Sequence, residues 1–210
     1  APIAPASGRR DNSTQVYGVA SLDDFGKVLS EILDACAAQD IPADAAVSEY
    51  APGQFEINLH HVADPLLAAD HAMLFKRTVK SVANANGFDA SFMAKPFPEL
   101  AGSGLHIHLS VVDAEGRNRF DGGEAVLSDT MRHAIGGLAA TMPESMAVFA
   151  PTANSYRRFR VGAYAPLTPS WGINNRTVAI RVPGGPGSSR RLAHRVAGAD
   201  AIVYLAMAAV

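Results

Sequence analysis

The segment from residue 102 to residue 111, GSGLHIHLSV, constrains the fold most, because apolar and polar side chains alternate in it with a period of two. In an extended strand, successive side chains point to opposite faces of the sheet. His106, His108 and Ser110 therefore share one face of the predicted strand, and the apolar residues between them share the other. The pattern predicts a strand that buries one face and presents two imidazoles and a hydroxyl on the other.

Helical patterns and further strand patterns alternate along the rest of the chain. Ser21 is the expected N-cap of an amphipathic helix that ends before Pro42. Further helices are predicted over 64–85, 128–142 and the last twelve residues, strands over 14–20, 90–97, 105–114, 176–183 and 190–197, and irregular loops over 150–169. Several strand pairs are joined by tight turns, which is typical of an α+β domain with a largely antiparallel, curved sheet flanked by helices.

Composition places the chain among ordinary globular proteins. Its 210 residues are 48% apolar and 18% charged, with a net charge of −2 and one cysteine. A single cysteine excludes an internal disulfide framework and fits a reducing compartment, so we expect a cytoplasmic protein without a membrane partner. Residues 1–12 are expected to be a flexible lead-in, and residues 13–210 one domain. Because the chain starts without Met, we expect it to be a fragment of a longer protein.

The charge distribution is less ordinary than the net charge. Between Glu144 and Asp200 the chain has no acidic residue and no lysine, but it has eight arginines, namely Arg157, Arg158, Arg160, Arg176, Arg181, Arg190, Arg191 and Arg195. Guanidinium groups suit bidentate recognition of phosphate and carboxylate. A nucleic-acid-binding face is a remote alternative, and it needs these arginines to be exposed on one surface.

Acidic residues flank a second turn, at Pro52-Gly53. Glu49 precedes this turn and Glu56 follows it, so a hairpin would fold the two carboxylates toward each other. Carboxylate oxygens together with an imidazole suit a divalent ion such as Mg²⁺ or Mn²⁺. Two solvated glutamates and a surface histidine pair are the plainer interpretation of the same residues. Acids, imidazoles and arginines on separate strands together indicate a metal–nucleotide site for phosphoryl transfer.

Four segments, taken in order, carry a resemblance to a known family. SEYAPGQFEINL, FMAKPFPELAGSGLHIHLS, PTANSYRRFR and NNRTVAIRVP resemble the catalytic domain of glutamine synthetases. YAPLTPSWG and RRLAHRVAGAD are similar to the branch that includes gamma-glutamylpolyamine synthetases. The resemblance covers residues 13 to 210 and implies an incomplete catalytic domain without the family's small N-terminal domain.

The resemblance also implies roles for individual residues. The implied metal ligands are Glu49, Glu56 and His106, the implied ATP-binding residues are His108, Ser110, Arg176 and Arg181, and the implied substrate-binding residues are Gly102, Arg158, Arg195 and Tyr164. Arg158 would bind the glutamate carboxylate, and Arg176 would face the phosphoryl group as it is transferred. These two arginines are therefore the expected catalytic residues.

The activity implied is ATP-dependent formation of a γ-glutamyl amide from glutamate and ammonia or an amine, through γ-glutamyl phosphate, with Mg²⁺ or Mn²⁺. The implied assembly is a homo-oligomeric ring with sites between subunits, so we expect weak or absent activity from these 210 residues alone. The alternative is a catalytically inactive homologue or fragment with an assembly or regulatory role.

Three positions depart from the family pattern. Ala193 stands where the family has a metal-binding glutamate, and its methyl group offers no oxygen. Tyr164 replaces a glutamate near the amine site of ammonia-using members, which indicates a larger amine or another nucleophile. Ile202-Val203 replaces an Asn-Pro pair, so the last helix is expected to begin without a side-chain cap.

Overall fold

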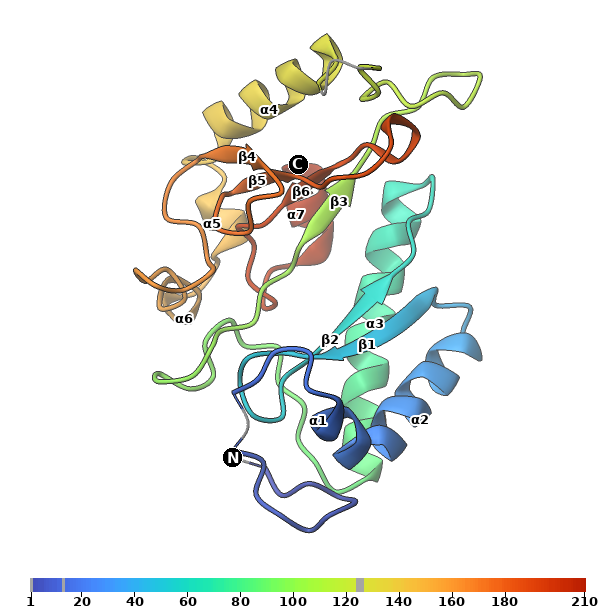
Figure 1. Ribbon diagram of the computed structural model, residues 1–210, viewed down its shortest axis with the longest axis vertical. Helices are drawn as coiled ribbons and strands as arrows, with labels where there is room; N and C mark the ends of the chain where they lie inside the picture. The colour runs from blue at the N-terminus through green and yellow to red at the C-terminus, as the bar shows by residue number, and fades with distance from the viewer. Residues whose placement is uncertain (1, 13, 124–126) are drawn as a thin grey trace. The chain divides into compact units, whose positions relative to one another are not determined.

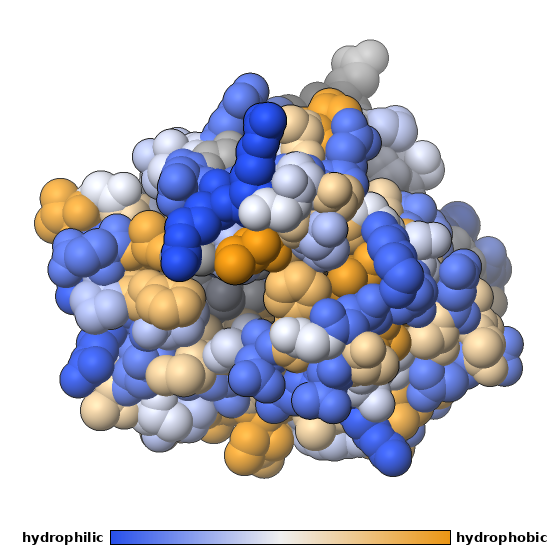
Figure 2. All heavy atoms as spheres, turned by 90° about the horizontal axis from the view of Figure 1, so that it is seen from below, coloured by the Kyte–Doolittle hydropathy of each residue, from blue (hydrophilic) through white to orange (hydrophobic). Residues whose placement is uncertain are grey.

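The computed structural model describes residues 2–12, 14–123 and 127–210. The chain divides into two compact units, Ala1–Phe92 and Met93–Val210, and each is described by itself below (Figure 1). Within the described ranges, no helix combines the length and apolar character that crossing a membrane requires. On the face shown in Figure 2, apolar side chains occur in small groups separated by polar and charged ones.

The first unit contains three helices and one hairpin among its described residues. These are α1 (Val19–Asp24), α2 (Gly26–Ala37), β1 (Ala43–Ser48), β2 (Phe55–Leu59) and α3 (Pro65–Ala85). Strands β1 and β2 pair antiparallel around the predicted Pro52-Gly53 turn, and Gly53 has the positive φ of 68° that such a turn requires. Helices α2 and α3 pack against this hairpin, which lies in front of α3 in Figure 1.

The start of the first unit differs from the sequence prediction. The predicted strand at 14–20 is wrong, because Tyr17 has a φ of 61° that interrupts any extended run, and α1 begins at Val19. Ser21 is buried inside α1 and is not a cap; the N-cap residue is Gly18, which has no side chain to bond. The predicted lead-in falls partly on residues that are not described; within 2–12, Ala4 is buried and Ile3 pairs with Arg10.

The second unit is built around a four-stranded sheet. Its elements are β3 (Ile107–Leu109), α4 (Asp129–Thr141), α5 (Met146–Phe149), α6 (Ala153–Tyr156), β4 (Trp171–Ile173), β5 (Ile180–Val182), the 3₁₀ turn η1 (Gly187–Ser189), β6 (Leu192–His194) and α7 (Val203–Ala208). The strand order is β3-β6-β5-β4, with β4 and β5 parallel and the other pairs antiparallel. The α+β class and the largely antiparallel pairing are therefore confirmed.

One face of this sheet is the core of the second unit. Ile107, His194 and Ile180 lie side by side on β3, β6 and β5, and all three are buried. Met131 and Ile135 from α4 and Ala206 from α7 belong to the same apolar cluster. This arrangement leaves the opposite face of the strands to the residues at alternate positions.

Caps and side-chain bonds explain where the second unit follows or departs from prediction. The predicted helix at 128–142 is confirmed, and the Ser128 hydroxyl accepts a hydrogen bond of 3.1 Å from the amide of Met131. The predicted strand at 90–97 is absent from the described residues there, because the Asn154 side chain bonds both the amide (2.9 Å) and the carbonyl (2.8 Å) of Lys95. The predicted loop at 150–169 contains α6, and α7 begins without a side-chain cap, as expected.

Candidate anion and nucleotide site

In the first unit, the two predicted carboxylate ligands share one face of the hairpin. Glu56 pairs with Val47, and the amide of Glu49 donates a hydrogen bond of 2.8 Å to the carbonyl of Gln54. Glu49 therefore lies diagonally across the ladder from Glu56, on the same face, where side chains come within about 7–8 Å. Both residues are half-buried. Carboxylate oxygens in this arrangement fit the donors that Mg²⁺ or Mn²⁺ takes.

In the second unit, the face opposite the core carries a row of four residues across the sheet. His108 of β3 pairs with Ala193 of β6, Ala193 pairs with Arg181 of β5, and Arg181 pairs with Gly172 of β4. Ala193 is fully buried at the middle of the row. A methyl group thus stands between an imidazole and a guanidinium group.

Arginines of β6 bond the two predicted histidines on this face. The Nε of Arg191 donates a hydrogen bond of 3.1 Å to Nδ1 of His108. Two positions along the ladder from the His108–Ala193 pair, Nη1 of Arg195 lies 3.4 Å from Nδ1 of His106. Because a guanidinium group can only donate, each Nδ1 acts as the acceptor. No sequence pattern predicts a site role for Arg191, although its alternation with Ala193 and Arg195 indicates its place on this face.

The charges around both histidines are cationic. Desolvation by neighbouring protein atoms, followed by the charge of Arg195, lowers the pKa of His106 below its usual range. Desolvation and then Arg191 lower the pKa of His108 in the same way. Each ring remains partly open to solvent. Both effects favour neutral imidazoles, so each ring carries its one proton on Nε2 when Nδ1 accepts.

Arg158 is the most buried arginine of the predicted site, at 5% exposure. Its Nη2 donates a hydrogen bond of 3.2 Å to the carbonyl of Val196, and its Nη1 has no hydrogen-bond partner among the described residues. Desolvation lowers the pKa of Arg158 to about 10, and the charge of Asp200 opposes this shift, so the group stays protonated at neutral pH. A methyl group on Gly102 would collide with Cγ of Arg158, which explains the glycine there.

The remaining predicted residues lie further from this cluster. The carbonyl of Arg176 accepts a hydrogen bond of 3.0 Å from Nη2 of Arg195, while the side chain of Arg176 is exposed. Ser110 follows β3 and is exposed. Tyr164, at 68% exposure, lines a cavity of about 530 Å³ that loop 160–170 shares with Thr177 and Val178.

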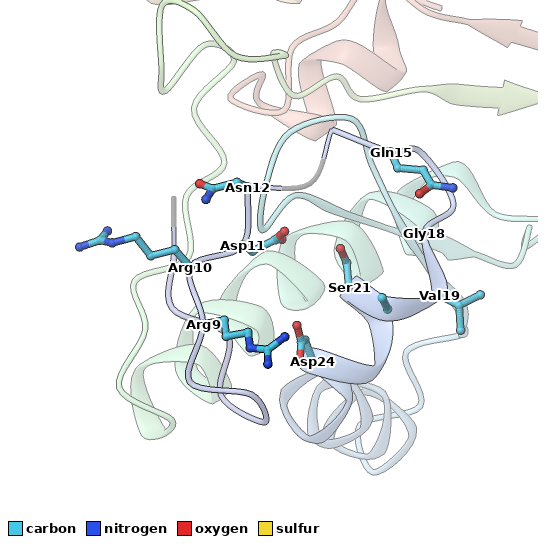
Figure 3. Close-up of a pocket in the computed structure, with 10 residues that line it drawn as sticks. Arg9, Arg10, Asp11, Asn12, Gln15, Gly18, Val19, Ser21 and Asp24 are labelled. Atoms are coloured by element: carbon cyan, nitrogen blue, oxygen red, sulfur yellow. The ribbon is translucent and has the colours of Figure 1, made fainter.

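The first unit has a further cavity, of about 270 Å³, that no sequence pattern predicts. Arg9, Asp11, Ser21 and Asp24 are among the residues that line it (Figure 3). Asp11 is already engaged, because its Oδ2 accepts a hydrogen bond of 3.0 Å from the amide of Gly53. The cavity contains none of the predicted site residues.

The donor set of the second unit fits phosphate better than a metal ion. Among the described residues, no group of three or more His, Cys, Asp or Glu side chains is arranged to hold a metal ion. The charged groups that act on His106 and His108 are arginines, joined in the case of His106 by His108. The face therefore offers hydrogen-bond donors for an anion, and the role of His106 as a metal ligand stays a prediction. The meeting of Glu49 and Glu56 with His106 stays a prediction, since these residues belong to separate units.

Comparison with known proteins identifies the family. The sequence model of the glutamine synthetase catalytic domain matches residues 1–210. The chain belongs to the glutamine synthetase family. Among its relatives within the family, the chain is 47% identical over 209 residues to gamma-glutamylputrescine synthetase of Escherichia coli K12, covering 100% of the chain and 44% of the relative. It is 38% identical over 198 residues to glutamate–isopropylamine ligase of a Pseudomonas species, covering 93% of the chain and 42% of the relative.

Solved structures agree with this membership of the glutamine synthetase family. The structure of GmaS in complex with ADP, in its first conformation, is 38% identical to the chain with a TM-score of 0.84, covering 94% of the chain and 47% of GmaS. A crystal structure of a novel glutamine synthase homologue is 26% identical, also with a TM-score of 0.84. The chain spans about half the length of the curated relatives that it matches.

Proposed function

We propose that this chain is part of an ATP-dependent ligase that forms a γ-glutamyl amide from glutamate and ammonia or an amine. The observation that carries the proposal is the sheet face where Arg181, Arg191 and Arg195 surround two neutral histidines. Such a face suits the phosphate oxygens of a nucleoside triphosphate. Membership of the glutamine synthetase family implies use of ATP and a divalent metal in general.

The proposed reaction has two steps. An oxygen of the glutamate side-chain carboxylate attacks the γ-phosphorus of ATP, ADP leaves, and an acyl phosphate forms. The amine nitrogen then attacks the acyl carbon, phosphate leaves, and the amide forms after the nitrogen loses a proton. Arg176 and Arg181 would neutralise charge on the transferring oxygens, and Arg158 would hold the glutamate carboxylate. A divalent ion bound by Glu49 and Glu56 would supply positive charge for the phosphoryl transfer.

The remaining predicted residues complete the proposed site. His108 and Ser110 would line the nucleotide, and Gly102, Arg195 and Tyr164 would contact glutamate or the amine. The names of the relatives include putrescine, ethanolamine and isopropylamine as amines. We propose an amine of this kind as the acceptor, since Tyr164 removes a carboxylate that would favour ammonium. Assembly into a homo-oligomeric ring belongs to the same proposal and is tested by light scattering after size-exclusion chromatography.

An ADP-release assay on the gene product that carries this chain tests the proposal. Glutamate is supplied with ammonia, putrescine, ethanolamine or isopropylamine, and the amide product is identified by mass spectrometry. Arg181→Lys is expected to lower kcat by about 10²-fold or more, because it removes a donor at the developing charge. Arg132→Lys is the matched control, since Arg132 pairs with Asp129 on the surface of α4. If no amine supports glutamate-dependent ADP release, the proposal is contradicted.

An inactive homologue is the second candidate, and the buried methyl group of Ala193 favours it. Such a protein would keep the anion-binding face and lose turnover. Binding of ADP without any glutamate-dependent ADP release would support this second candidate.

A further inference from the structure

We propose that His106 is a hydrogen-bond donor to an oxyanion and not a divalent-metal ligand, so that this face of the second unit binds phosphate or carboxylate oxygens without a metal at His106. The inference rests on the proposed function and changes the role of one of its residues. It follows from the hydrogen bonds of the two histidines, from a niche beside Gly104, and from the side chain at position 193.

The hydrogen bonds fix which nitrogen of each ring is available. Nδ1 of His108 accepts from Arg191 at 3.1 Å, and Nδ1 of His106 faces Nη1 of Arg195 at 3.4 Å. With its Nδ1 lone pair used in this way, a neutral ring carries its proton on Nε2. A protonated Nε2 has no lone pair to give a metal ion, whereas it donates well to an anion.

Gly104 lies next to that nitrogen and has no side chain that would cover it. A methyl group on Gly104 would lie 3.6 Å from Nε2 of His106 and 3.6 Å from Nη2 of Arg158. The carbonyl of Ala197, 3.8 Å from the same point, already accepts a hydrogen bond of 2.8 Å from the amide of Leu105. The niche therefore has an imidazole donor and a guanidinium donor on its walls, and an acceptor that is in use.

The buried end of Arg158 is the second donor of this niche. The atom beside Gly104 is Nη2, which donates one N–H to the carbonyl of Val196 at 3.2 Å and has a second N–H to offer. The side chain is only 5% exposed, and an acceptor beside Gly104 would add a partner to this buried charge. The charge of Asp200 also acts on Arg158. Oδ2 of Asp200 accepts hydrogen bonds from the hydroxyls of Thr152 (3.1 Å) and Ser155 (2.6 Å).

Ala193 removes the acceptor that a metal ion would need. It pairs with both His108 and Arg181, so any side chain at this position points to the same face as they do. Its methyl group offers no oxygen, and the segment between Glu144 and Asp200 contains no acid that could replace one. The charged groups that act on His106 are thus three arginines and His108, and none of them is an acid.

Nitrogen-15 NMR of the histidine rings in metal-free protein gives the first test. Long-range correlations are expected to show His106 and His108 with the proton on Nε2, and His106→Gln assigns the first ring. A ring of His106 protonated on Nδ1, with a free Nε2, would overturn the inference.

Calorimetric titration with inorganic pyrophosphate, and separately with L-glutamate, gives the second test and distinguishes the two sources of oxyanion. In excess EDTA, at least one of them is expected to bind. His106→Ala should weaken that binding about tenfold or more, and His106→Gln, which keeps a donor, should restore most of it. If neither pyrophosphate nor glutamate binds in EDTA, or if His106→Ala and His106→Gln lose affinity equally, the inference is contradicted. His133→Ala, on the exposed side of α4, is the control.

Manganese binding gives the third test. His106→Ala is expected to leave Mn²⁺ affinity unchanged, and a loss of tenfold or more would refute the inference. Ala193→Glu is expected to weaken anion binding about tenfold and to add a Mn²⁺ site that depends on His106, with Ala193→Gln as the uncharged match. If Ala193→Glu fails to fold by circular dichroism, the His106 variants still decide. A chain that binds pyrophosphate in EDTA but never releases ADP refutes the proposed function alone.

Discussion

The imidazole of His194 packs against the phenyl ring of Phe149 with ring centroids 4.4 Å apart. His194 is 1% exposed, and neither of its ring nitrogens has a hydrogen-bond partner among the described residues. Desolvation lowers the pKa of His194 to about 4 from its usual 6.5. The core of the second unit therefore contains a base that is stable there only in its neutral form.

This burial predicts acid sensitivity. Between pH 6.5 and pH 4 the unfolded chain binds a proton at His194 that the folded chain does not, so stability is complete above pH 6.5 and falls as the pH drops to 4. The loss is about 3 kcal/mol. In urea unfolding followed at several pH values, His194→Leu should flatten this slope. His106 and His108 shift the same way, so part of the slope should remain. If the stability of His194→Leu falls with pH as steeply as that of the surface control His133→Leu, the prediction is contradicted.

Asn118 holds the loop between β5 and β6. Its side-chain amide donates to the carbonyls of Arg190 (2.7 Å), Ser188 (3.2 Å) and Gly187 (3.5 Å). Asn118→Ala should lower the free energy of unfolding by about 1–3 kcal/mol, because these carbonyls lose their donor. Arg117→Ala is the neighbouring control. The side chain of Arg117 is 73% exposed, so its ion pairs contribute less than about 1 kcal/mol to the free energy of unfolding. Equal effects of the two substitutions would show that the loop does not depend on Asn118.

Two glycines with open space around them should respond to alanine in opposite ways. An added methyl group meets no atom within 4 Å at Gly136, inside α4, or at Gly87, which has a φ of 77°. Gly136→Ala should raise the free energy of unfolding by about 0.5–1 kcal/mol, and Gly87→Ala should lower it by about 1–2 kcal/mol. Thermal melts of both variants check the pair, and a stabilising Gly87→Ala would rule out the left-handed turn.

Gly102 positions Arg158 in the proposed substrate site. A methyl group there would collide with Cγ of Arg158 and lie 2.6 Å from the carbonyl of Ala94. Gly102→Ala should raise the KM for glutamate about tenfold, the change expected when one charged contact is displaced. Gly137→Ala, in open space on α4, is the control. An unchanged KM in a folded variant would remove Gly102 and Arg158 from the glutamate site.

The local patterns predicted much of the fold. The period of two at His106 and His108, the Ser128 cap and the Pro52-Gly53 hairpin all depend on neighbours in sequence, and the structure contains each of them. The errors come from contacts between distant residues. Asn154 captures the backbone of Lys95 from 59 positions away, so the predicted strand there does not form.

The site shows the same division. Alternation along the strands predicted which side chains share a face, but it could not predict that Arg191 bonds His108 across 83 positions. That bond determines which ring nitrogen of His108 remains available to donate, and only the register of β3 against β6 sets it. The role of Ala193 could be inferred only from the resemblance, since an alanine has no chemistry of its own to signal a site.

The row from His108 through Ala193 to Arg181 gives one position control over the charge at the middle of the sheet face. Every residue except glycine has a Cβ atom, so exchanging alanine for an acid at position 193 changes the charge of the row and leaves the ladder hydrogen bonds in place. A single codon at position 193 therefore sets whether the middle of this face is apolar or charged, without rebuilding the strands.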